Sequence, residues 1–498
     1  MKRVFSHPVS ALLVGLCLRL LFVLQFPQDS GDTGLYEQLA TNWLKSHVYG
    51  VSVGDVLTPM DIRVPGYPAY LALIYAVTGR TGEDARLWVM LGQVVVDLAT
   101  CVVIASLAAL LAQFLASSWK PSRVFCVALW LTALCPFTGN YVAVPLTETI
   151  SLFFTAIASL LSCLLFCRLR ARGFPELAAK MRWNPGVGLL SALLGFSVGL
   201  GSMFRPETPL LLAVLWLVAA PYLALRRELR RLLQIAAISG LACLVPMAPW
   251  AIRNAITLHK LQPLAPKYSN MPGEIIPYGF MKWERTWLYR FRDVYLVPWN
   301  LNSESISVDT MPSYAFDSED ERNRIAAILE EYNQDNTLTA EEDHAFGEIG
   351  AERTARHPLR TYLTVPAKRS LVMWFTPRIE LLPFNGRVWP IEEGWEADPV
   401  DFCFTIGFFV LNVVYVSLAI WGATRLWRSG SAARTSLIFF LAYALIRTAF
   451  LTTLETPEPR YVLECFPMLL ALVAFALTKR SAQYGARFSA PPVARGGS

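Results

Sequence analysis

The chain has 498 residues, of which 54% are hydrophobic and only 16% are charged, and its mean hydropathy is +0.40. This composition excludes a soluble globular protein and favours a polytopic membrane protein. The formal net charge is +6. The sequence contains no Gly-x-x-x-x-Gly-Lys-Ser/Thr loop, which argues against ATP-driven transport by this chain alone.

A helix that crosses a membrane needs about 20 apolar residues, and ten stretches meet this requirement. They are residues 8–26, 87–113, 124–143, 146–167, 186–204, 207–225, 232–252, 402–424, 435–454 and 461–478. An even number of spans places both termini on one side of the membrane. Basic residues concentrate in the alternate loops 168–182, 226–231 and 425–434, so the positive-inside rule predicts cytoplasmic termini. The arginine-rich composition favours a bacterial inner membrane.

The predicted fold is an all-α polytopic membrane protein with about ten transmembrane helices, juxtamembrane helices on the outer face and a periplasmic loop subdomain. Residues 66–79 are apolar but too short to cross, so we expect a helix lying on the outer surface. The expected pieces are a membrane module (1–252) with a first outer loop (27–86), a large, partly helical outer loop (253–401), C-terminal helices (402–478) and a disordered cytoplasmic tail (479–498).

The large outer loop contains three predicted helices. Residues 317–332 and 339–356 have helical composition, and Thr339-Ala-Glu-Glu begins the second as a capping box. Residues 357–375 mix apolar and basic side chains, which is typical of an amphipathic helix at a membrane surface. The aromatic residues of the preceding segment have two interpretations, the core of a small cap or a face that stacks sugars and touches the membrane. They are Trp283, Trp287, Tyr289, Tyr295 and Trp299.

Few polar residues lie within the predicted spans. Because Asp97 shares the outer half of the membrane with Arg19 and Arg447, we expect a structural ion pair with one of these arginines. A proton or ion path is the functional alternative. The five histidines and nine cysteines show no metal-ligand spacing, so no metal site is predicted.

Many polar residues gather at the outer helix ends, and they occur in short motifs. These are Asp32-Thr-Gly-Leu-Tyr36, Arg63-Val-Pro-Gly-Tyr-Pro68, Thr147-Glu148, Arg205-Pro-Glu207, Pro249-Trp250 with Arg253-Asn254, and Arg460-Tyr461. In this order and on one side of the membrane, the motifs resemble those of the C superfamily (GT-C) of integral-membrane glycosyltransferases. Within it, the chain resembles the bacterial branch related to protein O-mannosyltransferases and lipid A aminoarabinose transferases. The family often has a second acid directly after the first aspartate, whereas this chain has Thr33 there and Asp29 three residues before Asp32.

The resemblance implies a hexosyl- or pentosyltransferase that moves a sugar from a polyprenyl-phosphate donor to an acceptor hydroxyl, with inversion at the sugar carbon. Such a reaction needs a carboxylate to take the proton of the attacking hydroxyl and arginines to neutralise the departing phosphate. We assign Asp32 as the base, with Asp29 as the second candidate. The expected substrate and phosphate contacts are Arg63, Tyr36, Tyr67, Glu148, Arg205, Arg253, Arg460 and Tyr461. Residues 253–401 are expected to select the acceptor.

Each assignment has a structural alternative. Asp32 would cap a helix, Arg63 would anchor lipid headgroups, and Arg205 would pair with Glu207. Arg253 and Arg460 would pair with Glu458 or Glu148, and the tyrosines would be ordinary interface residues. No cofactor is expected from the residues, while the family leaves open a divalent cation held by Asp29, Asp32 and Glu148.

The expected partners are the lipid-linked sugar donor, an acceptor glycan, lipid or protein, and membrane lipids, with no nucleic acid. Two other functions compete with the transferase: a transporter or flippase of lipid-linked sugars, and a polysaccharide polymerase or ligase.

Overall fold

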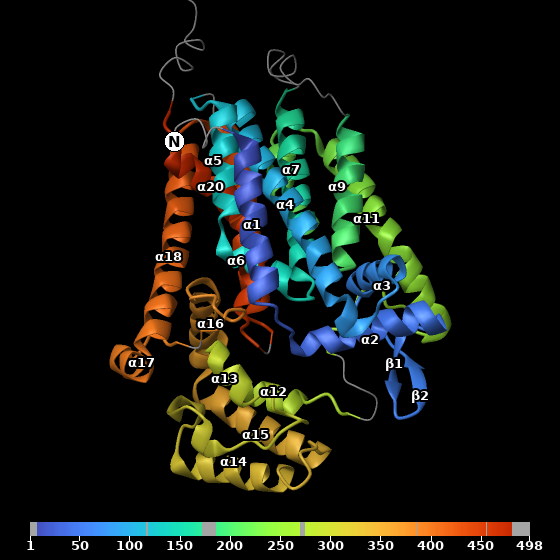
Figure 1. Ribbon diagram of the computed structural model, residues 1–498, viewed down its shortest axis with the longest axis vertical. Helices are drawn as coiled ribbons and strands as arrows, with labels where there is room; N and C mark the ends of the chain where they lie inside the picture. The colour runs from blue at the N-terminus through green and yellow to red at the C-terminus, as the bar shows by residue number, and fades with distance from the viewer. Residues whose placement is uncertain are drawn as a thin grey trace, which may run out of the picture.

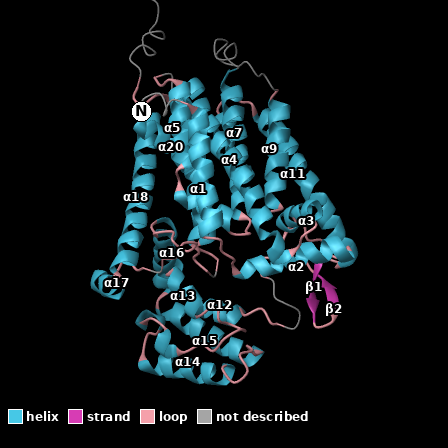
Figure 2. Cartoon of the chain, in the orientation of Figure 1, coloured by secondary structure: helices cyan, strands magenta, loops and turns pink. Residues whose placement is uncertain are grey.

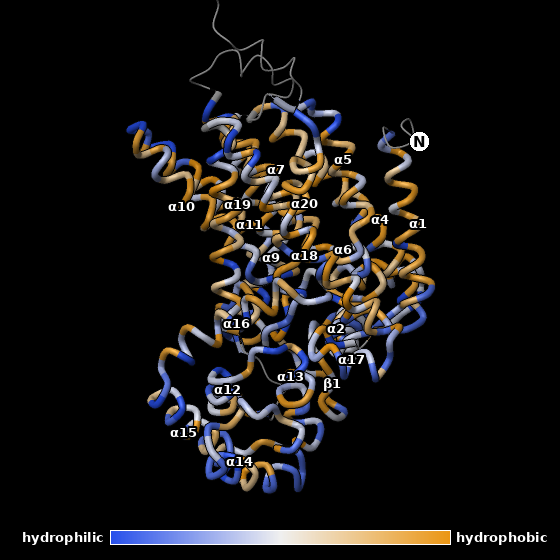
Figure 3. The backbone as a smooth tube through the Cα atoms, turned by 90° about the vertical axis from the view of Figure 1, so that its left-hand side faces the viewer, coloured by the Kyte–Doolittle hydropathy of each residue, from blue (hydrophilic) through white to orange (hydrophobic). Residues whose placement is uncertain are grey.

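The computed structural model describes residues 7–115, 118–171, 186–268, 274–384, 386–454 and 456–480, and it shows an all-α multi-pass membrane protein, as the sequence predicts. The long helices form one bundle, and a smaller helical unit lies beyond one end of it (Figure 1). We call this unit, residues 274–356, the loop subdomain and the adjoining end of the bundle the loop end. Apolar residues dominate the bundle and hydrophilic residues the loop subdomain (Figure 3). The predicted tail lies largely outside the described residues.

Seven helical segments of the described chain are long and apolar enough to cross a membrane. They are α1 (Pro8–Gln25), α4 (Arg86–Leu110) flanked by η2 (Gly82–Ala85) and η3 (Leu111–Leu115), α7 (Glu148–Ala171), α11 (Leu229–Thr257), α18 (Pro399–Trp427), α19 (Ser431–Leu451), and η8 (Pro459–Cys465) continued by α20 (Phe466–Leu477). They correspond to seven of the ten predicted spans.

The other three predicted spans differ from a regular crossing helix. The third is broken, because α5 (Pro121–Ala133) meets α6 (Pro136–Gly139) and η4 (Asn140–Ala143) at an angle of 55°. Pro136 lacks a backbone N–H and cannot continue α5. The fifth and sixth are the short apolar helices α9 (Val187–Ser202) and α10 (Leu210–Ala224).

Between α1 and α4 the chain lies across the loop end of the bundle (Figure 1). It forms α2 (Gly31–Ser46), the antiparallel strands β1 (Gly50–Val53) and β2 (Val56–Pro59), and α3 (Gly66–Thr78). This hairpin is the only β-structure in the described part of the chain (Figure 2). The helix α3 matches the short surface helix that the sequence predicts. One side of it buries Tyr67 and Tyr75 while Leu73 and Val77 stay exposed, so α3 is half-buried against α2.

The loop subdomain contains α12 (Tyr278–Glu284), α13 (Phe291–Leu296), α14 (Glu319–Tyr332) and α15 (Ala340–Arg356), with the short turns η5 (Val308–Thr310) and η6 (Ser313–Ala315). Both predicted helices of this region are present, and Thr339 and Glu342 form the predicted capping box. Trp283 and Trp287 are buried in a separate apolar core, which confirms the core interpretation for these two. Tyr295 and Trp299 are 47% and 43% exposed and do not belong to that core.

The segment after α15 joins the loop subdomain to the bundle. The predicted amphipathic helix is present as η7 (Arg360–Thr364) and α16 (Val365–Trp374), followed by α17 (Ile391–Ala397). Tyr362 and Leu363 are exposed on it, whereas Arg369 is buried. The Arg369 guanidinium donates to the carbonyl oxygen of Leu288 at 2.6 Å and to that of Leu454 at 2.7 Å. Since these carbonyls belong to the subdomain and to the segment that follows α19, one side chain connects the two units.

A buried ion pair links α1 and α4 inside the bundle. Arg19 Nε lies 2.7 Å from Asp97 Oδ2, and both side chains are almost fully buried. Arg19 also donates to the carbonyl oxygen of Thr132 at 3.1 Å, which connects α1 to the end of α5. The predicted pairing of Asp97 is therefore found with Arg19, while Arg447 pairs elsewhere.

Asp97→Ala leaves the Arg19 charge buried without its carboxylate. We expect a loss of about 3–5 kcal/mol in the free energy of unfolding, measured by thermal or denaturant unfolding in detergent. In the double variant Arg19→Leu with Asp97→Leu, which removes both charges, most of this loss should disappear. Unchanged stability of Asp97→Ala would contradict the structural role of the pair.

Candidate functional site

The site is built around Asp32, in the first turn of α2. The backbone N–H of Ser30 donates to Thr33 Oγ1 at 3.0 Å, which fixes the start of the helix. A carboxylate in a first turn is favoured by the positive end of the helix dipole. Arg63 Nη2 donates to one Asp32 oxygen at 2.7 Å, and Arg460 Nη2 donates to the other at 3.2 Å. Two arginines from distant parts of the chain therefore hold the two oxygens of one carboxylate.

The electrostatic surroundings keep Asp32 ionised. Burial by itself raises the pKa of the Asp32 carboxyl, but the positive charges of Arg63 and Arg460 outweigh burial, so this pKa lies below its ordinary value. Nearby, burial raises the pKa of the Tyr36 hydroxyl to about 12. Tyr36 is therefore a hydrogen-bond donor at neutral pH, next to a fully charged carboxylate.

Arg63 is positioned by the loop between β2 and α3. The Tyr49 hydroxyl donates to the carbonyl oxygen of Arg63 at 2.9 Å. The backbone N–H of Gly66 donates to the carbonyl oxygen of Met203 at 2.6 Å, which docks this loop onto the turn that carries Arg205. The loop thereby brings Arg63 and the turn after α9 to the same place.

Arg460 and Tyr461 belong to η8, on the other side of Asp32. Arg460 Nε lies 2.5 Å from a Glu458 oxygen, and the Tyr461 hydroxyl donates to Glu458 at 2.5 Å. The Tyr461 ring lies within 5.6 Å of the guanidinium carbons of both Arg205 and Arg460. These cation–π contacts favour a fixed spacing between the two arginines.

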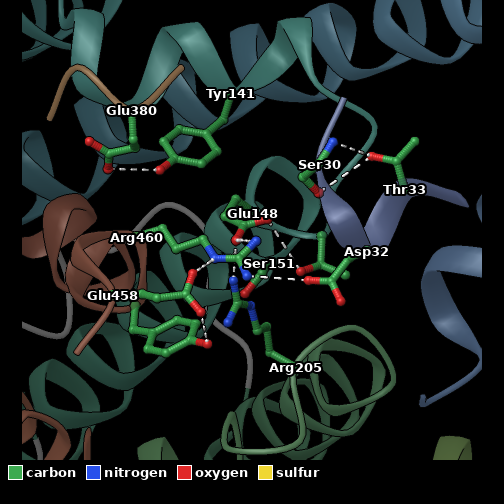
Figure 4. A network of polar contacts seen from close by, with 12 residues as sticks. Ser30, Asp32, Thr33, Tyr141, Glu148, Ser151, Arg205, Glu380, Glu458 and Arg460 are labelled. Carbon is green, nitrogen blue, oxygen red and sulfur yellow. Dashed lines mark hydrogen bonds and ion pairs between the residues drawn. The ribbon is translucent and has the colours of Figure 1, made fainter. Parts of the chain in front are cut away.

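A chain of alternating charges continues from Asp32 into the bundle, and Figure 4 shows its first members, Arg460, Glu148 and Arg205. Arg460 Nη1 lies 3.6 Å from Glu148 at the start of α7, and Glu148 also accepts a hydrogen bond from Arg205. Arg205 is 3.9 Å from Glu464 in η8. Arg447 of α19 lies 3.1 Å from both Glu464 and Glu207. Since unpaired charges are costly at this depth, the alternation stabilises each member.

Two cavities meet at Asp32. The smaller, of about 240 Å³, is the basic cavity, because its charged lining consists of four cations and three carboxylates. These are Arg63, Arg205, Lys267, Arg460, Asp32, Glu148 and Glu207. The larger, of about 740 Å³, is the aromatic cavity. It is lined by Phe291, Tyr295 and Trp299 of the loop subdomain, by the carboxylates Asp29, Asp32, Glu380 and Glu458, and by Arg63 and Arg460.

The boundary between the cavities consists of residues that line both. They are Asp32, Arg63, Leu146, Arg460 and Tyr461. The Asp32 carboxylate is 24% exposed, so a small molecule in either cavity has access to it. A carboxylate in this position can accept a proton from a molecule in one cavity, while the arginines paired with it bind an anion in the other.

The structure brings most of the predicted site residues to these cavities. Tyr36, Glu148 and Arg205 line the basic cavity beside Asp32, Arg63, Arg460 and Tyr461. The structural alternative for Arg205 is also partly present, since it lies 3.7 Å from Glu207. Arg460 likewise has the ion pair with Glu458 that the sequence offers as its alternative.

Three predicted residues lie apart from the Asp32 centre. Asp29 lines the aromatic cavity, but its ion pair is with Arg86 at 3.4 Å. Tyr67 is fully buried and its hydroxyl donates to the Gln93 side chain at 2.8 Å. Arg253 donates to the carbonyl oxygens of Tyr49 and Met60 at 2.5 and 2.7 Å and lines a different cavity of about 520 Å³.

Three charged residues of the site are not among those that the sequence motifs indicate. Glu464 is an ionisable residue near the start of a predicted span, and that position alone marks it as a candidate. Lys267 and Glu380 lie in irregular segments of the outer loop, where nothing in the local pattern distinguishes them. Within the described ranges, no three His, Cys, Asp or Glu side chains are arranged to hold a metal ion.

Neither the family models nor the curated proteins contain a match to this chain. Among solved structures, it is similar to the Archaeoglobus fulgidus oligosaccharyltransferase in the apo form, with 13% identity and a TM-score of 0.47 over 94% of this chain and 50% of that chain. It is also similar to ArnT from Cupriavidus metallidurans bound to undecaprenyl phosphate, with 13% identity and a TM-score of 0.39 over 94% of this chain and 77% of that chain.

Both similar proteins are GT-C glycosyltransferases, the superfamily that the sequence motifs resemble. This chain spans about half the length of the oligosaccharyltransferase. Because every TM-score is below 0.5, these likenesses assign no residue role, substrate or partner to the chain.

The docking of the Arg63 loop depends on the close approach of Gly66 to Met203, and a substitution at Gly66 tests it. A Cβ at position 66 would lie 2.3 Å from the Met203 carbonyl oxygen, whereas a Cβ at Gly407 meets nothing within 4 Å. We expect Gly66→Ala to reduce stability by about 1–3 kcal/mol and Gly407→Ala to have almost no effect, measured as melting temperatures in detergent. Equal melting temperatures for the two variants would contradict the tight docking of the Arg63 loop.

Proposed function

We propose that this chain is a glycosyltransferase that moves a sugar from a polyprenyl-phosphate donor to an acceptor hydroxyl at the outer face of the inner membrane. The observation that carries the proposal is the position of Asp32, which lines two cavities and is held by two arginines. A transferase that joins two substrates needs a base at their meeting point. The basic loops at the other end of the spans support cytoplasmic termini.

The charges of the two cavities distinguish their ligands. The basic cavity has an excess of cations and suits the donor phosphate, while carboxylates outnumber cations in the aromatic cavity and disfavour an anion. Lys267 lines the basic cavity and, among the described residues, has no ion pair with a carboxylate. It therefore offers a positive charge that is not already neutralised, in addition to the paired arginines.

The lipid part of the donor needs apolar surroundings. A cavity of about 610 Å³ is lined mainly by apolar side chains of α18, α19 and α20, and it reaches Cys465, the residue after Glu464. Its lining includes Trp374 near the loop end and Arg428 near the opposite end. We assign this groove to the isoprenoid tail, because burial of such a chain is favourable by about 0.8 kcal/mol per CH₂ group.

In the proposed reaction, the acceptor oxygen forms a bond with the anomeric carbon while its proton passes to Asp32. The bond from that carbon to the phosphate oxygen breaks, and its electron pair leaves with the phosphate. Arg63 and Arg460 stabilise the growing negative charge there. Attack from the aromatic cavity and departure into the basic cavity occur on opposite faces of the sugar carbon, so the product has inverted configuration.

Donor binding also changes the basicity of Asp32. In the structure, the two arginines lower the pKa of this carboxyl. A phosphate in the basic cavity competes with Asp32 for the same guanidinium groups, which raises the Asp32 pKa toward the range where a base accepts protons efficiently. Asp32 thus becomes a better base when the donor is present.

Asp32→Asn removes the proton acceptor and keeps the size of the side chain. We expect transfer to fall by about 100- to 10,000-fold, measured with purified protein, radiolabelled polyprenyl-phosphate sugars and membrane acceptors, while donor binding persists. Asp55→Asn, at the exposed hairpin turn, is the matched control and should be fully active. Retained transfer by Asp32→Asn would remove the base assignment, and movement of the labelled lipid without a new glycosidic bond would support the flippase.

The acidic limb of the pH profile of kcat/KM reports the pKa of the Asp32 carboxyl in the free enzyme. Since Arg63 lowers the Asp32 pKa, Arg63→Gln raises it, and the acidic fall of kcat/KM should move to higher pH. Arg80→Gln, on the exposed turn after α3, should keep the wild-type profile. An acidic limb that stays in place or moves to lower pH in Arg63→Gln would contradict the coupling.

A further inference from the structure

The aromatic cavity has a lining that the reaction chemistry alone does not explain. Phe291 and Tyr295 belong to α13 and Trp299 follows this helix. Their ring centroids are 4.4 to 5.7 Å apart. Tyr295 and Trp299 are about half exposed, unlike the buried Trp283 and Trp287 of the same subdomain. Large aromatic side chains that line a cavity without filling it are available for a ligand.

Carboxyl groups accompany the rings. Glu380 accepts a hydrogen bond from the Tyr141 hydroxyl at 3.3 Å, and Glu458 accepts one from Tyr461. Burial raises the pKa of the Glu380 carboxyl above its ordinary value. A carboxylate accepts hydrogen bonds from the hydroxyl groups of a ligand. The cavity therefore combines flat apolar faces with acidic hydrogen-bonding groups.

We propose that the acceptor is a saccharide, held by Tyr295, Trp299 and Glu380 so that one hydroxyl meets Asp32; this inference rests on the proposed transferase function. The C–H groups on one face of a pyranose ring form an apolar surface that packs on an aromatic ring, and its hydroxyls bind carboxyl groups. The excess of carboxylates disfavours an anionic acceptor. A cavity of about 740 Å³ accommodates more than one sugar ring, so a short glycan fits.

Asp32 lines the aromatic cavity, so a hydroxyl of a saccharide bound there can reach the base. Asp32, Arg63 and Arg460 form the edge of the aromatic cavity that faces the donor side. A sugar stacked on the rings that line the same cavity can therefore present a hydroxyl toward the base. Tyr295 and Trp299 act as specificity-determining residues, and the choice of acceptor depends on the loop subdomain.

The test compares Trp299→Ala, Trp299→Phe and the control Trp395→Ala, which removes an exposed tryptophan of α17 outside the cavity. The full-length protein in nanodiscs is assayed with maltotriose, mannotriose and a serine-containing tripeptide as acceptors, and slow transfer of the donor sugar to water is recorded as well. Direct saccharide binding is measured separately by saturation-transfer NMR.

We expect transfer to at least one trisaccharide, and a rise in its KM of roughly five- to tenfold in Trp299→Ala, with partial rescue in Trp299→Phe and none of this effect in Trp395→Ala. Transfer to water should stay unchanged, because the donor side is intact. Transfer to the peptide alone, or an unchanged saccharide KM in Trp299→Ala, would overturn the inference while leaving the transferase standing. Saccharide binding that depends on Trp299 without any transfer would support the saccharide site and contradict the transferase.

Discussion

Arg63 and Arg460 both donate hydrogen bonds to the Asp32 carboxylate. The geometry of the whole site follows from this contact. Asp32 and Arg460 are 428 residues apart in the chain, so their contact requires α2, the loop before α3 and η8 to meet at one point. A carboxylate with this little access to water is costly unless it is paired. The same pairing separates the two cavities and couples occupancy of one to the basicity of the group that faces the other.

Arg460 is itself held by Glu148, a carboxylate at the start of α7. Glu148, Arg205, Glu464 and Arg447 continue the alternation away from Asp32, and they come from α7, the turn after α9, η8 and α19. Each charge is positioned by neighbours of opposite sign on different helices. The loop end of the bundle is thus a preorganised electrostatic environment, which is the form in which proteins stabilise developing charge most effectively.

The sequence predicts those features that depend on local pattern. Apolar length locates most of the spans, the short run 66–79 gives α3, and Thr339 with Glu342 marks the start of α15. The sequence also limits the partner of Asp97 to Arg19 or Arg447, because few charged residues exist at that depth, and the structure selects Arg19. Contacts between distant segments are not local: nothing near Arg253 in sequence shows that it binds the carbonyls of the β-hairpin. The break at Pro136 is hidden within an apolar run that has the length of a full span.

The most direct measurement is a structure of the full-length protein in nanodiscs with a phosphonate analogue of the lipid-linked sugar, in which the scissile oxygen is replaced by carbon. The account predicts that the phosphonate lies in the basic cavity, bonded to Arg63 and Arg460, with the anomeric carbon facing the Asp32 carboxylate and the isoprenoid tail beside α18 and α19. A phosphonate bound among Phe291, Tyr295 and Trp299, or one that makes no contact with either arginine, would contradict it.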